Sequence, residues 1–173
     1  MAVTYKKIAS VTVGSGGATE IDFQNIPQSG YTDLVVKMSL RDTITGTGNA
    51  WQAFDIYFNN STANRTQRYL FGTGSGTGSG SGTEIFGQAV EGGATANTFA
   101  NGEMYVTNYT SSSNKSISLD QVTENNATAA LQYLTAALWS NSAAIDRITL
   151  KANTYGTSFA QHSTATLYGI SNS

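Results

Sequence analysis

The chain contains a single histidine, so His162 decides whether a catalytic serine could have an imidazole base. A serine nucleophile needs such a base, held in place by a carboxylate. His162 lies between Gln161 and Ser163 at the start of a strand-like segment, and the chain has no Gly-x-Ser-x-Gly turn. We therefore interpret His162 as a surface or strand-end residue, and we expect the chain not to be an enzyme.

Paired carboxylates are the second route to catalysis that the sequence offers. Glycoside hydrolysis uses two carboxyl groups roughly 5–10 Å apart across a cleft. Most of the acidic residues lie within or at the ends of strand-like segments, where a charge favours solubility and protects a sheet edge. The sequence does not show which of them meet; the candidates include Asp42, Asp55, Glu84, Glu91, Glu103, Asp120 and Glu124.

Metal and phosphate sites have weak support. Glu20 and Asp22 are two residues apart and would share one strand face, an arrangement that suits Ca²⁺, but no EF-hand loop or histidine pair accompanies them. A solvated strand face is the better interpretation. The Gly-Ser-Gly-Thr-Gly segment that begins at Gly74 lacks the Gly-Lys-Ser/Thr ending of a phosphate loop. We expect no metal and no cofactor.

Aromatic side chains offer a binding function instead. A flat ring can stack on the apolar face of a sugar while amide groups supply hydrogen bonds, although aromatic residues also fill cores and subunit interfaces. We predict that Trp139, in an apolar segment before a turn, belongs to the core, and for Trp51 both readings stay open. The candidate partner or glycan contacts are Trp51, Tyr57 and Tyr155.

Alternation with period two is the recurring structural signal, and it indicates half-buried strands. In residues 31–40 the side chains of Leu34, Val36, Met38 and Leu40 form an apolar face. Similar segments recur near residues 5–13, 21–23, 53–58, 68–71, 84–90, 103–109, 115–122, 147–151 and 161–170. So many short two-faced strands without a clear helix predict an all-β, antiparallel β-sandwich.

One segment fits two structures. Ala127, Ala130, Leu131, Leu134 and Leu138 have helical spacing, whereas Leu131, Tyr133, Thr135, Ala137 and Trp139 form one face of a strand. Clusters of Asn, Ser and Thr bound this segment as they bound the other strands. We predict a strand here and keep the helix as the alternative.

The Gly/Ser/Thr-rich segment 72–83 has glycine at every second position from Gly72 to Gly82. Such a segment has little apolar area to offset the entropy lost on ordering, so we predict a long, exposed, flexible loop between two strands. Neither flank has the length and pattern of a separate domain, so residues 1–173 are expected to form a single β-sandwich domain.

Composition narrows the class of partner. The chain has 9 basic and 11 acidic residues, and charged residues make up 12% of it. So few Lys and Arg residues disfavour nucleic-acid binding, which depends on neutralising phosphates. No segment approaches the roughly 20 apolar residues of a membrane span. Cysteine is absent, so no disulfide or thiolate site is available.

Three segments follow one another in the C-terminal third of the chain: Ala137-Leu-Trp139, Ala143-Ala-Ile-Asp-Arg-Ile-Thr-Leu150 and the closing Ser163-Thr-Ala-Thr-Leu-Tyr-Gly-Ile170. This succession resembles virion proteins of tailed bacteriophages. Closing strands of this kind occur in phage decoration (cement) proteins and in head-fibre and tail-fibre modules. The Tyr31-Thr-Asp-Leu-Val-Val36 segment after Asn25-Ile-Pro27 fits the same pattern.

This resemblance implies a jelly-roll-like β-sandwich that acts by assembly, as a homotrimer on the major capsid protein or another virion protein. The expected function is a non-enzymatic capsid decoration (cement) protein that stabilises the particle. The alternative is a receptor- or glycan-binding module of a tail or head fibre. The start of the chain lacks the apolar segment of a signal peptide, so we expect synthesis in the host cytoplasm and display on the virion surface.

Overall fold

The computed structural model describes residues 4–47, 49–124, 129–152 and 157–171. In this part of the chain the regular elements are all strands, and no helix long and apolar enough to cross a membrane occurs. The strands are β1 (Tyr5–Thr12), β2 (Glu20–Phe23), β3 (Asp33–Leu40), β4 (Trp51–Phe58), β5 (Arg65–Gly72), β6 (Thr77–Gly82), β7 (Phe86–Val90), β8 (Ala100–Val106), β9 (Lys115–Glu124), β10 (Ala130–Trp139), β11 (Ile148–Ala152) and β12 (Thr164–Ile170).

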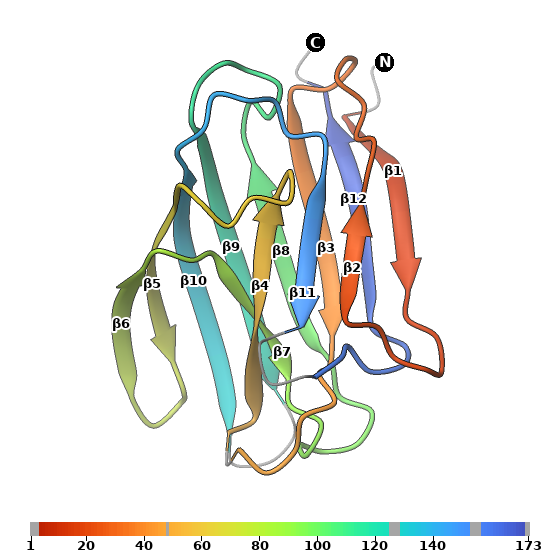
Figure 1. The fold of residues 1–173 in the computed structure, drawn as a ribbon. Helices are drawn as coiled ribbons and strands as arrows, with labels where there is room; N and C mark the ends of the chain where they lie inside the picture. The colour runs from red at the N-terminus through yellow and green to blue at the C-terminus, as the bar shows by residue number, and fades with distance from the viewer. Residues whose placement is uncertain (1–3, 48, 125–128, 153–156, 172–173) are drawn as a thin grey trace.

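Two antiparallel sheets form a sandwich (Figure 1). The large sheet has the order β1-β12-β3-β8-β9-β10-β5-β6, and the small sheet has the order β2-β11-β4-β7. The first four strands alternate between the sheets, and β7, β8, β11 and β12 return to pair with them, as in a jelly roll. The predicted jelly-roll-like β-sandwich is therefore confirmed, with the hairpins β5–β6 and β9–β10 added to one side of the large sheet.

The apolar faces of the two sheets meet in one core. β9 alternates buried and exposed residues along its whole length, as a strand with one face on the core does. Trp139 is 1% exposed and packs against Phe58, with ring centroids 5.6 Å apart. The predicted core position of Trp139 is confirmed. The strand predicted from Leu131 to Trp139 is also confirmed, because Ala130–Trp139 forms β10, while Ala127 lies outside the described residues.

The Gly/Ser/Thr-rich segment is not the loop that its composition predicts. Residues 77–82 form β6, which pairs in register with β5 from Gln67 opposite Gly82 to Gly72 opposite Thr77. Aromatic side chains of β5 provide the apolar cover that β6 itself lacks. A Cβ atom added to Gly78 would lie 2.5 Å from the Phe71 ring, and one added to Gly80 would lie 2.3 Å from the Tyr69 hydroxyl.

Candidate binding cleft

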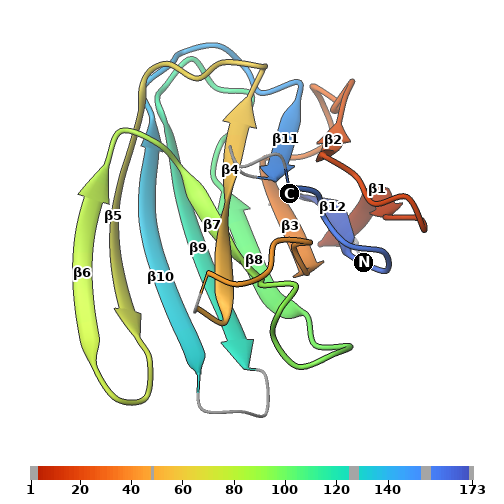
Figure 2. The same ribbon diagram turned by 60° about the horizontal axis from the view of Figure 1, so that its bottom comes forward.

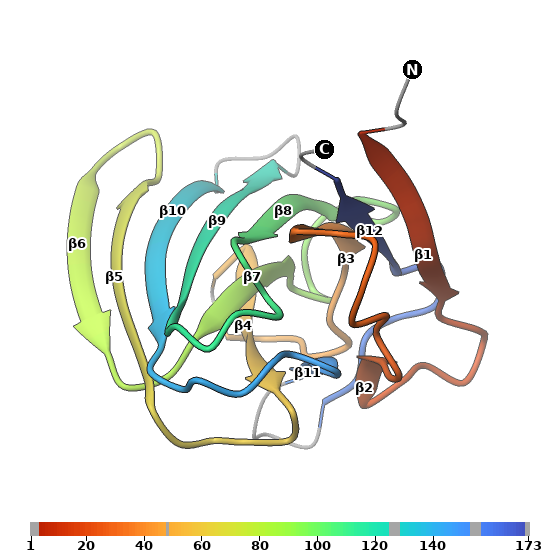
Figure 3. The same cartoon turned by 90° about the horizontal axis from the view of Figure 1, so that it is seen from above.

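The small sheet covers only part of the large one. Its edge strand β7 lies over β9, so the inner faces of β10, β5 and β6 continue beyond it (Figures 2 and 3). Residues of β5 and β10 form the floor of an open cleft, and the Tyr69 and Phe71 rings of this floor lie over glycines of β6. The outward-facing residues of β4 and β7, among them Trp51 and Gln88, form its wall.

Two glutamines hold the wall against the floor. The Gln121 side chain of β9 accepts a hydrogen bond from the Gln88 N–H (2.9 Å) and donates to the Gln88 carbonyl (3.4 Å). The Gln67 side chain of β5 accepts from the Phe86 N–H (3.3 Å). Gln67 and Gln121 are 1% and 2% exposed. Their amides therefore satisfy the backbone of an edge strand in place of a neighbouring strand.

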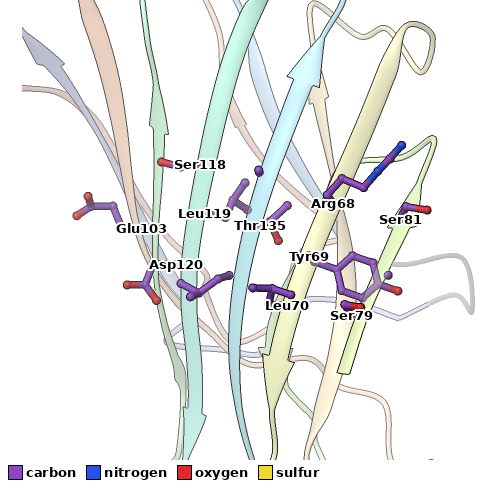
Figure 4. A pocket seen from close by; sticks show the side chains of 13 residues that line it. Arg68, Tyr69, Leu70, Ser79, Ser81, Glu103, Ser118, Leu119, Asp120 and Thr135 are labelled. Atoms are coloured by element: carbon purple, nitrogen blue, oxygen red, sulfur yellow. The ribbon is translucent and has the colours of Figure 1, made fainter. Parts of the chain in front are cut away.

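Aromatic rings line the floor of the cleft. Tyr69 and Tyr133 are stacked with centroids 5.0 Å apart, and Phe71 is stacked 6.4 Å from Tyr133. Phe86 of the wall packs edge-on against Tyr69 at 5.6 Å. The Tyr69 ring extends from β5 toward β6 (Figure 4), over the position that the glycine leaves free. The missing Cβ of Gly80 is therefore what allows this ring to lie flat on the sheet.

The cleft has a volume of about 360 Å³, and one of the three aromatic residues predicted as partner or glycan contacts belongs to it. Trp51, at the start of β4, lines it. Tyr57 lies further along the same face of β4, outside the cleft, where its ring stacks under the Arg65 guanidinium at 4.7 Å. Tyr155 lies outside the described residues. The full lining is Asn49, Trp51, Gln52, Ala53, Tyr69, Phe71, Phe86, Gln88, Leu131 and Tyr133.

The cleft lining is uncharged, and hydrogen-bonding groups lie among its rings. The Tyr133 hydroxyl and the Gln88 side-chain oxygen are buried and have no partner of hydrogen-bond geometry within the described chain. Burial, with Tyr69 next to it, raises the pKa of Tyr133, so its phenol stays neutral. The cleft thus combines apolar ring faces with amides and a neutral phenol, which can bind by stacking and hydrogen bonding.

A second concave surface lies on the opposite, outer face of the same strands (Figure 4). It is a trough of about 780 Å³ across β8, β9, β10, β5 and β6. Leu70 and Leu134 face each other across β5 and β10 and are 61% and 44% exposed. Val122, 37% exposed, lies on the same outer face of the sheet, on β9 opposite Gln132 and outside the trough lining. We call Leu70, Leu134 and Val122 the outer apolar patch.

Among the carboxylates named from the sequence, the buried Asp42, whose pKa is raised mainly by burial, lies near the buried Glu91, and a second pair is Glu103 and Asp120. The latter two are direct cross-strand neighbours of β8 and β9 at the rim of the trough (Figure 4). Glu103 also forms an ion pair with Lys37. Both carboxyl groups lie on the open outer surface of the sheet rather than across an enclosed cleft.

Two further candidates named from the sequence are Asp22 and His162. Asp22 forms an ion pair with Arg147 at 2.7 Å and accepts a hydrogen bond from the Thr149 hydroxyl. Burial alone would raise the pKa of Asp22, but these contacts outweigh it and hold the pKa below the usual value of 3.8. His162 is an exposed turn residue with φ of 71°, beside the start of β12. The described residues contain no group of three potential metal ligands among His, Cys, Asp and Glu.

Sequence reasoning missed most of the cleft. In the sequence, Tyr69, Phe71 and Tyr133 indicate strands but no binding site. Nothing in the sequence analysis points to Gln67 or Gln121. The available signal was an amide at an inward-facing position: Gln121 continues the buried face of Ile117 and Leu119. Comparison with protein-family models, curated proteins and solved structures gives no match. The geometry is therefore the basis for any functional proposal.

Proposed function

We propose that this chain is a non-enzymatic surface module of a virus particle whose aromatic cleft binds a glycan. One observation carries the proposal: five aromatic side chains converge with three amides on one open, uncharged cleft. These are Trp51, Tyr69, Phe71, Phe86 and Tyr133, with Asn49, Gln52 and Gln88.

This chemistry matches that of a sugar chain. Sugar rings present C–H groups on their faces and hydroxyl groups at their edges, so they need flat apolar surfaces flanked by donors and acceptors. A carboxamide both donates and accepts, which suits a hydroxyl group. The Tyr69 and Phe71 rings extend this apolar floor over Gly80 and Gly78 of β6.

The same lining supports binding rather than turnover. General acid–base catalysis needs a group whose pKa lies near the working pH. Tyrosine is the single ionisable type among the cleft residues, and burial moves the pKa of Tyr133 further from neutrality. The placement on a virus particle rests on the resemblance of the C-terminal third to phage virion proteins.

We predict that Trp51→Ala weakens glycan binding at least tenfold, about 1.4 kcal/mol, because one wall of the cleft loses its ring. Trp51 is half-buried at the start of β4, so the variant should still fold. Binding is measured by calorimetry with neutral oligosaccharides selected on a glycan array.

Tyr57→Ala is the matched control. It removes an aromatic ring from the same face of the same strand but outside the cleft, so affinity should stay within twofold of the parent chain. A parent chain that binds no glycan on the array would overturn the proposed function. Equal losses of affinity in the two variants would show that Trp51 is not a specific contact.

Capsid decoration is a second candidate, favoured by the outer apolar patch. Leu70 and Leu134 expose apolar area in the trough and Val122 exposes it on the same face of the sheet, and such area commonly marks a protein contact. In this role the patch would dock on a capsid subunit, and repeated docking would add interface area across the lattice.

We expect Leu134→Lys to reduce attachment to capsids that lack the protein by at least tenfold, because a charge would replace apolar area at the contact. Ser10→Lys is the control, since Ser10 is exposed on the outer face at the opposite end of the same sheet. Attachment is measured by co-sedimentation and by cryo-electron microscopy. Full occupancy of capsids by Leu134→Lys would rule out this docking surface.

A further inference from the structure

The two sheets end in four edge strands, and three of these carry features that block further pairing. β1 has exposed Lys6 and Lys7 and an irregularity in register between Lys7 and Ala9. β2 is four residues long and bears Glu20 and Asp22. β7 is covered by the glutamine side chains that bind its backbone. Charges, irregularities, short length and cover are the usual protections of a sheet edge.

β6 has none of these protections. It is six residues long, uncharged, free of proline and paired regularly with β5 along its length. In the described part of the chain, no strand pairs with its other side (Figures 1 and 2). Its outward N–H and C=O groups therefore form a template for another strand.

We propose that β6 pairs antiparallel with β6 of a second copy of this chain, so that the two large sheets join into one. The alternating sequence makes this edge complementary to itself. A two-fold axis normal to the sheet keeps each face on its own side, so glycines oppose glycines and Ser79 and Ser81 oppose serines. The pairing brings no like charges together, because β6 has no charged side chain.

The pair would also unite the functional surfaces. Gly78 and Gly80 of each copy are covered by Phe71 and Tyr69 of the same copy, so the rings would meet across the new junction. The two clefts then face the same side of one sheet, and the two outer patches face the other. A glycan chain could contact both clefts, which gives avidity without any new type of contact.

Single cysteines test this pairing directly, because the chain contains no native cysteine. Directly opposed residues of antiparallel strands lie about 4.5–5.5 Å apart between Cα atoms, within reach of a disulfide. We expect mild oxidation to cross-link Ser79→Cys, Ser81→Cys or an equimolar mixture of the two, depending on register. Ser118→Cys, exposed on the same outer face in the interior of the sheet, should cross-link at least tenfold less.

Sedimentation velocity without ligand gives the second measurement. The parent chain should have the mass of two copies, whereas Ser79→Lys and Ser79→Glu should each be monomeric with unchanged circular dichroism. Mixing these two variants should restore the dimer by charge pairing. A monomeric or trimeric parent chain, or no cross-linking above the Ser118→Cys level in all three samples, would overturn the inference. Glycan binding is measured separately and is unaffected by that outcome.

Discussion

Arg41→Met is expected to lower the free energy of unfolding by about 3 to 5 kcal/mol. The Arg41 guanidinium donates hydrogen bonds to the carbonyls of Gly92, Ala94, Thr95 and Thr98, at 2.8 to 2.9 Å. Methionine would fill a similar volume and leave these carbonyls without a donor. Chemical denaturation gives the free energy, and the melting temperature should fall by on the order of 10 °C.

Arg68→Met is the matched control for this prediction. Arg68 is exposed on the outer face of β5, and its guanidinium donates to the carbonyl of the adjacent Gln67 at 2.8 Å. The same substitution there should change stability by no more than about 0.5 kcal/mol. Similar stabilities for the two variants would mean that the 92–98 segment holds its conformation without Arg41.

Arg41 illustrates a class of residue whose role could not be read from the sequence. Burial lowers the pKa of Arg41, and its guanidinium donates to backbone carbonyls of the 92–98 segment and to the Thr98 hydroxyl. Lys115 is similar: it is fully buried, and its ammonium donates to the carbonyls of Ser111, Ser113 and Asn141. Arg41 binds a loop that is distant in the sequence, and Lys115 binds segments without a regular pattern. No periodicity in the sequence therefore identifies either residue.

The sandwich itself was predictable because its signal is local. Many strands carry their own alternation of apolar and polar residues, and β9 follows it along its whole length, which is enough to decide which of its faces is buried. The helical spacing around Leu134 and Leu138, the alternative for this segment, does not correspond to a helix. Those residues lie on the outer face of β10, where Leu134 is 44% exposed and belongs to a surface patch.

The cleft was not predictable because its parts come from four separated strands. Trp51 and Tyr57 are alike in the sequence, because both are aromatic residues on one face of one strand. In the structure, Trp51 lies beside β7 and the floor of the cleft, whereas the Arg65 guanidinium covers the Tyr57 ring. The added hairpins β5–β6 and β9–β10 supply the floor and the trough, while the jelly roll supplies the wall. Both candidate functional surfaces thus depend on additions to a common scaffold.

Gly80→Val is expected to destabilise the protein by about 2 to 3 kcal/mol, although valine favours strands. Its Cβ would fall 2.3 Å from the Tyr69 hydroxyl and 2.4 Å from the adjacent ring carbon, so the ring would have to leave the surface of β6. The stack of Tyr69 on Tyr133 would open with it. We therefore expect glycan affinity to fall at least tenfold together with stability.

Ser81→Val separates this effect from ordinary strand propensity. It places the same side chain one residue further along β6, on the exposed outer face, where its neighbour is Arg68. Stability should change by no more than about 0.5 kcal/mol, and affinity should not change. Thermal unfolding and calorimetry of the two variants give both quantities. If Gly80→Val is as stable as Ser81→Val, the glycines of β6 reflect composition alone, and the floor of the cleft does not depend on them. If it is less stable, the alternating glycines are a structural requirement of an aromatic surface built by the neighbouring strand.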